Sequence, residues 1–319
     1  MNKGVKKKQQ NTSALNSKLI RRQIKKKFWL FLMPTFLAFC IGFVWPFIFG
    51  IYLSFFKFLT IREILTLDFS KISAHFVGFE NYVRAFSDVS FRRAFFYTSA
   101  FTVVSVLVIN VLAFFLAYLL TQNGIKGKNI FRTVFFMPNL IGGIVLGYIW
   151  KLIFDGILIR YNTYLTSNAT YGFWGLVILL AWQQIGYMMI IYISGFQSVS
   201  DDIIEAASID GANRWQTLFK IIIPNMMASI TICTFLSLTN SFKLYDQNLS
   251  LTGGLPIVTN GGVQTKLTEM LALNISSSFA SQGAYARGTA QAKAVLFFIM
   301  VAIISLIQLR ATRSKEVQK

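Results

Sequence analysis

Polar side chains interrupt two otherwise apolar stretches of this sequence, at residues 171–196 and 222–244. In chain order they are Trp182, Gln183, Gln184, Tyr187, Ser237, Asn240 and Ser241. Leu244 extends the second group, whose members recur at spacings of three and four and therefore share one helix face. Amide and hydroxyl groups can hydrogen-bond the hydroxyls of a sugar, and a Trp or Tyr ring can stack on its apolar face. This combination favours a neutral polyol over an anion.

Each of these side chains also has a plainer interpretation. Polar groups at membrane depth are costly, so they face either a pathway or a neighbouring helix. Hydrogen bonding between helices accounts for such residues as well as ligand binding does. Both alternatives stay open at every one of these positions.

Other reactive chemistry is scarce in the sequence. It contains one histidine, His75, which excludes a histidine cluster for metal binding or acid-base catalysis and is interpreted as a surface residue of an outer loop. A phosphate-binding loop needs the pattern G-x-x-x-x-G-K-[ST]. Gly124 and Gly127 have the wrong spacing, and Asn129 follows Lys128. We therefore expect a protein that is not an enzyme and that binds neither a metal nor ATP itself.

The composition indicates which elements hold these residues. The 319 residues are 55% hydrophobic and 13% charged, with a mean hydropathy of +0.56, which is too apolar for an ordinary soluble core. A membrane helix needs about 20 apolar residues. The sequence predicts an all-α fold with six such helices, at residues 29–55, 95–120, 134–154, 171–196, 222–244 and 288–309. An amphipathic segment near residues 83–91 predicts a further helix on the membrane surface.

The positive charge is distributed unevenly along the chain. The net charge is +19, and ten of the 31 Lys and Arg residues precede residue 28. With that tail inside, nineteen fall on the cytoplasmic side, so the positive-inside rule places both termini in the cytoplasm. The tail is interpreted as a topology signal and a contact for anionic lipid, with nucleic-acid binding as the alternative. We expect a disordered tail at 1–27, one membrane domain at 28–312 and a second tail at 313–319.

A polar segment at about residues 200–224 separates the fourth and fifth predicted spans. Asp202 with Glu205, and Asn213 with Gln216, each have the spacing of a capping box, which predicts two short helices. Gly211 lies between them, where a chain leaving a helix often needs positive φ. Apolar residues recur at helical spacing in the second helix and predict a stripe that anchors it on the bundle. They are Trp215, Leu218, Phe219 and Ile222. The alternative is a loop that only connects two spans.

The same segment resembles a family signature. Permease subunits of binding-protein-dependent ABC importers carry Glu-Ala-Ala, three residues, Gly, nine residues, Ile, one residue, Leu-Pro. The matching residues here are Glu205, Ala206, Ala207, Gly211, Ile221 and Pro224, with Ile223 in place of Leu. The resemblance implies a coupling helix that docks into an ATPase subunit. It assigns the coupling role to Glu205, Ala206, Ala207, Asp210 and Gly211, with both alanines leaving room for the partner.

Residues 25–312 resemble the maltose-type sugar permeases more broadly. The segments 76–82, 131–138, 187–189, 241–243 and 252–256 look familiar for that group, and 288–298 is similar to multiple-sugar permeases of Gram-positive bacteria. The resemblance implies a bacterial plasma-membrane protein with a second permease subunit, two ATPase subunits that bind ATP and Mg, and an extracytoplasmic sugar-binding protein. It places substrate contacts at Gln184, Tyr187, Ser237, Asn240, Ser241 and Leu244.

Three rival functions stay open at this stage. An ABC importer of polyamines, phosphate or amino acids would need charged residues along the path, which the two polar faces lack. A secondary transporter would need intramembrane acids, whereas Asp155 and Asp246 fall near the ends of predicted spans. A membrane scaffold or sensor would use the polar segment for docking alone.

Overall fold

The computed structural model describes residues 27–29, 31–57, 75–122, 124–260, 262–283 and 285–314. The chain divides into two compact units, Met1–Leu53 and Ser54–Lys319. Most of the basic tail, the middle of the first outer loop and the last five residues lie outside the described residues. The predicted division into 1–27, 28–312 and 313–319 therefore stays a prediction.

The first unit contains one helix of membrane length. Residues 27–29 and 31–39 are helical, a π-helix follows at Cys40–Val44, and α2 spans Trp45–Leu53. Pro46 explains the wide turn, because proline has no N–H to donate and its ring crowds the carbonyl four residues earlier. This helix agrees with the span expected at 29–55.

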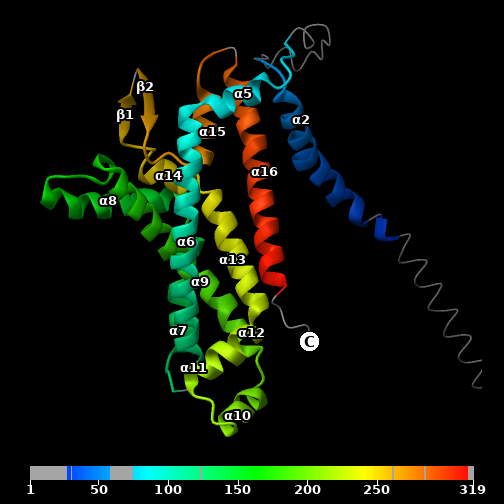
Figure 1. Cartoon of the computed structure of the whole chain (residues 1–319), viewed down its shortest axis with the longest axis vertical. Coiled ribbons are helices and arrows are strands. Elements are labelled where there is room, and N and C mark those ends of the chain that lie inside the picture. The colour runs from blue at the N-terminus through cyan, green and yellow to red at the C-terminus, as the bar shows by residue number, and fades with distance from the viewer. Residues whose placement is uncertain are drawn as a thin grey trace, which may run out of the picture. The chain divides into compact units, whose positions relative to one another are not determined.

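Three helices of the second unit are long and apolar enough to cross a membrane without a break. They are α6 (Val89–Thr121), α9 (Ala169–Gln197) and α16 (Ala286–Arg313). Together with α13 (Met227–Phe242) they form the bundle in Figure 1, in which α13 contacts all three. These helices confirm the spans expected at 95–120, 171–196 and 288–309, although each is longer than predicted.

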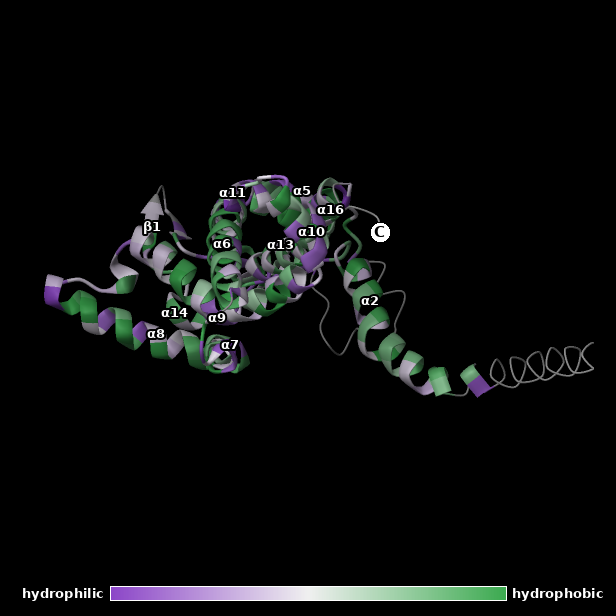
Figure 2. Ribbon diagram, turned by 90° about the horizontal axis from the view of Figure 1, so that it is seen from below, coloured by the Kyte–Doolittle hydropathy of each residue, from purple (hydrophilic) through white to green (hydrophobic). Residues whose placement is uncertain are grey.

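Apolar side chains also cover the outward faces of the helices. On α6, Phe96, Leu107 and Val111 are 70%, 60% and 63% exposed. Figure 2 shows hydrophobic residues along most of α8 (Gly143–Leu158) as well. A soluble monomer rarely exposes so much contiguous apolar surface. These faces therefore belong against lipid or another protein, as expected of a multi-pass membrane protein.

The third predicted span is broken rather than continuous. The helix α7 (Lys128–Phe136) runs into a 3₁₀ turn at Met137–Leu140, and α8 then leaves at 102° to it. Pro138 removes a backbone donor, and Ile141 and Gly142 are extended, so the helix cannot continue. The span expected at 134–154 is therefore a bent pair of helices, and the sequence did not predict the bend.

The fifth predicted span is bent as well. A short π-helix at Leu218–Ile222 precedes Pro224, and α12 (Ile223–Asn225) meets α13 at an angle of 73°. The Asn225 side chain donates to the Ile221 carbonyl at 2.8 Å, which satisfies a backbone group near the bend. Four continuous helices and two bent pairs bring the candidate spans among the described residues to six.

The segment between α13 and α16 is ordered although it is rich in Gly and Ser. Between α13 and α16 the chain forms a helix, an antiparallel hairpin and a second helix: α14 (Asp246–Leu251), β1 (Ile257–Asn260), β2 (Val263–Lys266) and α15 (Leu271–Ala280). The predicted surface helix is α5 (Glu80–Ser87), which ends before residue 91 because Asp88 caps α6 by accepting from the Ser90 N–H. The all-α prediction thus holds apart from one small hairpin.

Candidate functional site

Two predicted path residues meet between α9 and α13. The Asn240 amide donates to the Gln184 side-chain oxygen at 3.2 Å. Gln184 is 8% exposed and Asn240 is half-buried. This pair places uncharged donors and acceptors at a contact between two helices, and part of it stays accessible.

The two predicted serines are more deeply enclosed. Ser237 and Ser241 are fully buried, and the Ser241 hydroxyl donates to the Ser237 carbonyl at 2.7 Å. The Ser237 hydroxyl donates to the Cys233 carbonyl and accepts from the Asn110 amide at 2.7 Å. In this structure both hydroxyls make hydrogen bonds within the helix bundle, which matches the alternative that these residues hold helices together.

Asn110 of α6 joins three helices through its side chain. It donates to Ser237 of α13, and its oxygen accepts from the Tyr192 hydroxyl of α9 at 2.7 Å. We did not single out Asn110 or Tyr192 from the sequence. A lone amide in the middle of the apolar stretch 94–125 was the available signal, because such a group must find a partner at that depth.

The remaining predicted residues lie around this pair in different environments. Tyr187 is half-buried, and its ring lies 6.4 Å from that of Phe136. Leu244 is 4% exposed and follows the end of α13. The Gln183 amide donates to the Ile141 carbonyl at 3.1 Å, which satisfies a backbone group released at the break between α7 and α8.

Two glycines of α8 allow it to approach α14 closely. A Cβ on Gly143 would lie 2.8 Å from the Cβ of Asp246, and one on Gly147 would overlap the Ser250 hydroxyl. Gly142 has open space instead and contributes only to the extended break. Gly143 and Gly147 therefore permit the close contact between α8 and α14.

The polar segment folds as two short helices around Gly211. The first is α10 (Asp201–Ile209), and the second is α11 (Arg214–Thr217). Gly211 has φ +80°, the conformation that glycine adopts without steric cost. Asn213 and Gln216 form the predicted capping box, with both hydrogen bonds at 2.9 Å. The capping box predicted at Asp202 was wrong. The helix α10 begins at Asp201, its N-cap is Ser200, and no side chain caps it.

The residues assigned to coupling divide into exposed and buried ones. Glu205, Ala206, Asp210 and Gly211 are exposed, at the opposite end of the bundle from α5 and α15 (Figure 1). Ala207 is 6% exposed, and its carbonyl accepts the Ala212 N–H within the hairpin. The expectation that both alanines are open to a partner is therefore wrong for Ala207, which makes the turn compact.

The predicted apolar stripe is split between two sides of the hairpin. Leu218 is 6% exposed and Ile222 packs on the core. Trp215 and Phe219 are 70% and 60% exposed, and their rings stack 6.0 Å apart. The π-helix after α11 changes the residues per turn, so the four side chains no longer share one face. The prediction that all four anchor the hairpin was wrong for the two aromatic residues, which form an exposed pair.

The sequence reasoning missed a buried charged group near the outer end. Lys293 of α16 is 2% exposed. Its ammonium donates to the Asp88 carboxylate at 2.5 Å, the Ser278 hydroxyl at 2.7 Å and the Asn274 oxygen at 3.1 Å. The Asn274 amide in turn donates to Glu269 at 2.9 Å. A single lysine inside the stretch 288–309 was the signal, since ionisable residues there mark partners or function.

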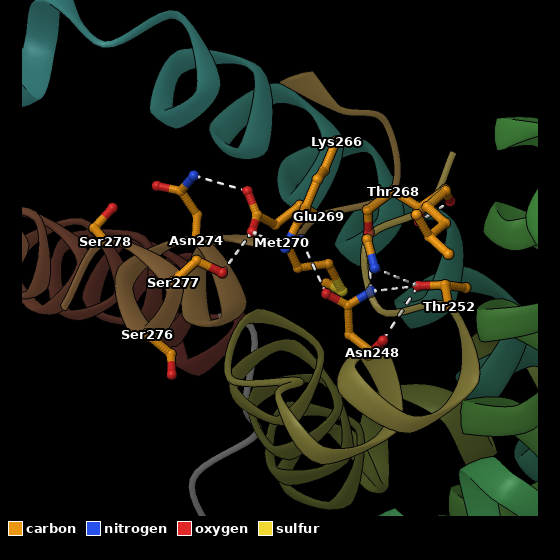
Figure 3. A network of polar contacts seen from close by, with 12 residues as sticks. Asn248, Thr252, Lys266, Thr268, Glu269, Met270, Asn274, Ser276, Ser277 and Ser278 are labelled. Atoms are coloured by element: carbon orange, nitrogen blue, oxygen red, sulfur yellow. Dashed lines mark hydrogen bonds and ion pairs between the residues drawn. The ribbon is translucent and has the colours of Figure 1, made fainter. Parts of the chain in front are cut away.

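Asn248 of α14 hydrogen-bonds the backbone just before α15. Its amide donates to the Thr268 carbonyl at 2.8 Å, and its oxygen accepts the Met270 N–H at 3.0 Å. Figure 3 shows these bonds together with those from Glu269 to Asn274 and Ser277. The network fixes the start of α15 on α14.

The chain is 40% identical to the "Probable starch degradation products transport system permease protein" AmyD of Thermoanaerobacterium thermosulfurigenes, over 91% of this chain and 95% of that protein. It is 29% identical to the multiple sugar-binding transport system permease protein MsmF of Streptococcus mutans, over 93% and 99%.

The fold is also similar to that of a solved transporter chain. A bacterial ABC transporter involved in the import of the acidic polysaccharide alginate has a chain that matches with a TM-score of 0.71 and 19% identity, over 92% of this chain and 98% of that one. Residues 121–314, which contain the hairpin and the bundle helices α9, α13 and α16, match the model of one family. The chain therefore belongs to the binding-protein-dependent transport system inner membrane components.

Proposed function

We propose that this chain is the permease subunit of an ATP-driven sugar importer and forms half of a path for oligosaccharides. The relatives that cover nearly the whole chain are named as permeases for starch degradation products and for multiple sugars. The hydrogen-bonded pair Gln184–Asn240 supports the same class of substrate, because α9 and α13 contain no Lys, Arg, Asp or Glu. An uncharged path favours a neutral sugar over a polyamine, a phosphate or a charged amino acid.

The proposed assembly contains a second, related permease, two ATPase subunits that bind ATP and Mg, and an extracytoplasmic sugar-binding protein. This chain would bind neither nucleotide nor metal itself. We place it in the bacterial plasma membrane with both termini in the cytoplasm, because nineteen of the 31 Lys and Arg residues then fall on the cytoplasmic side, ten of them in the basic tail. The basic tail would then contact anionic lipid rather than nucleic acid.

The exposed face of the hairpin is the observation that carries the coupling role. Glu205 and Ala206 project from α10, while Ala207 and Leu218 hold the hairpin together from inside. Closure of the ATPase dimer would push on this face. The bends before α13 and between α7 and α8 would then let rigid segments rock, so that the path opens outward.

Charge reversal on α10 tests this coupling. Glu205→Lys is expected to abolish uptake, because a carboxylate at the docking face becomes an ammonium. The binding protein with its sugar should then no longer stimulate ATP hydrolysis. Asp202→Lys is the matched control, since Asp202 is also exposed on α10 but lies one turn away. Uptake and stimulated ATPase activity are measured in proteoliposomes. Normal uptake by the Glu205 variant would exclude the coupling role.

A further inference from the structure

Two cavities adjoin at the outer end of the bundle, with volumes of about 360 Å³ and about 260 Å³. Both are lined by Asp88, Ser278 and Ser281, so we name them together the outer trough. The larger lies within the usual range for small-molecule sites, about 300–1,000 Å³. The trough is therefore large enough to hold part of a ligand.

The floor of the trough is fixed by the Lys293 network. An ammonium has three donors, and those of Lys293 are all used by Asp88, Asn274 and Ser278. The other Asp88 oxygen accepts the Ser90 N–H. The Lys293 ammonium therefore has no donor left for a ligand, so it shapes the trough rather than binds in it.

Every charge that lines the trough has a partner of opposite sign. Lys293 pairs with Asp88, Lys266 lies 3.6 Å from Glu269, and Arg84 pairs with Glu80 at 2.7 Å. The hydrogen bond to Glu80 also raises the pKa of Arg84 above its ordinary value, so the guanidinium stays charged. Because the charges cancel locally, the trough offers neither an anion nor a cation an uncompensated counterion.

The rim carries neutral polar groups that are available to a ligand. Gln282 is exposed and Thr289 is half-buried on the larger cavity, and neither side chain has a hydrogen-bond partner among the residues that the structure describes. The Arg84 guanidinium lies 3.8 Å above the Tyr285 ring, which stiffens the same rim. An amide, a hydroxyl and no net charge suit the hydroxyls of a neutral saccharide.

We propose that the outer trough is a saccharide subsite, which holds the outer end of a long oligosaccharide while its other end lies in the path. This proposal rests on the proposed function. Asn110, which bonds to Ser237, lies 22 residues beyond Asp88 along α6, so roughly 33 Å separate the two levels at ~1.5 Å per residue. A trisaccharide is shorter than that separation, whereas a heptasaccharide approaches it.

The test compares two sugars in the complete complex with its binding protein. We expect Gln282→Ala combined with Thr289→Val to raise the KM for maltoheptaose uptake about tenfold, the effect of two lost hydrogen bonds, and to leave maltotriose uptake unchanged. Thr170→Val is the control, because Thr170 is exposed at the outer start of α9 and does not line the trough.

Each other outcome has a distinct meaning. An equal loss for both sugars, no loss for either, or uptake of maltotriose without maltoheptaose in the unmodified complex overturns the subsite. Failure of the unmodified complex to take up any saccharide overturns the proposed function instead, and the subsite falls with it.

Discussion

Lys293 shows how much depends on a single partner at a buried position. Its side chain is 2% exposed, and Asp88, which is 33% exposed, supplies the compensating charge. Removing one member of a buried pair leaves an uncompensated charge and costs about 3–5 kcal/mol, whereas replacing both members is often nearly neutral. We therefore expect Asp88→Asn alone to lower thermal stability strongly, and the addition of Lys293→Met to restore most of it.

A double-mutant cycle in detergent measures this coupling through the melting temperature of each variant. Lys293→Met alone serves as the fourth corner of the cycle. If the double variant melts no higher than Asp88→Asn, the ion pair does not hold α16 to the start of α6.

Short sequence patterns predicted some residues well and missed others. The capping box at Asn213 and the positive φ of Gly211 follow from local backbone requirements, and both are present. The roles of Asn110 and Lys293 depend on residues more than 80 positions away, which no local pattern encodes. The assignment of Gln184 and Asn240 to the path stays a prediction, although the structure brings the two together.

At the level of elements, the contact between α8 and α14 depends on Gly147. A Cβ there would overlap the Ser250 hydroxyl and lie 3.3 Å from the Leu251 N. Gly147→Ala is expected to destabilise the protein by about 1–3 kcal/mol, the usual cost of overpacking. Gly156 lies in the same helix with open space around it, so Gly156→Ala is expected to be neutral or stabilising by about 0.5–1 kcal/mol.

Thermal unfolding of the two variants provides the comparison. Equal melting temperatures would mean that α8 does not pack on α14 in the folded protein. A selective loss in the Gly147 variant would show that the close approach is real, because helix propensity alone favours alanine at both positions.

Whole elements were predictable where one property runs along the chain. The helix α9 is a charge-free stretch of 29 residues with polar residues at both caps, and its bounds fall within two residues of the expected span. The bend at Ile141 was not predicted, because prolines and glycines permit a break without requiring one. Packing decides, and here Gln183 satisfies the carbonyl that the break releases.

At the scale of the whole molecule, the two ends of the bundle have different tasks. The end that carries α10 presents Glu205 and the stacked pair Trp215 and Phe219 on a compact hairpin. The opposite end holds the trough on a network of paired charges. Three continuous helices and two bent pairs of the second unit lie between the two ends.

Uptake of labelled maltotriose into proteoliposomes that hold the complete complex tests the proposed function most directly. We expect the sugar to accumulate above its outside concentration only when ATP is enclosed and the binding protein is outside. Accumulation driven by a proton gradient without ATP, or ATP hydrolysis without any saccharide uptake, would contradict a role in ATP-driven sugar import.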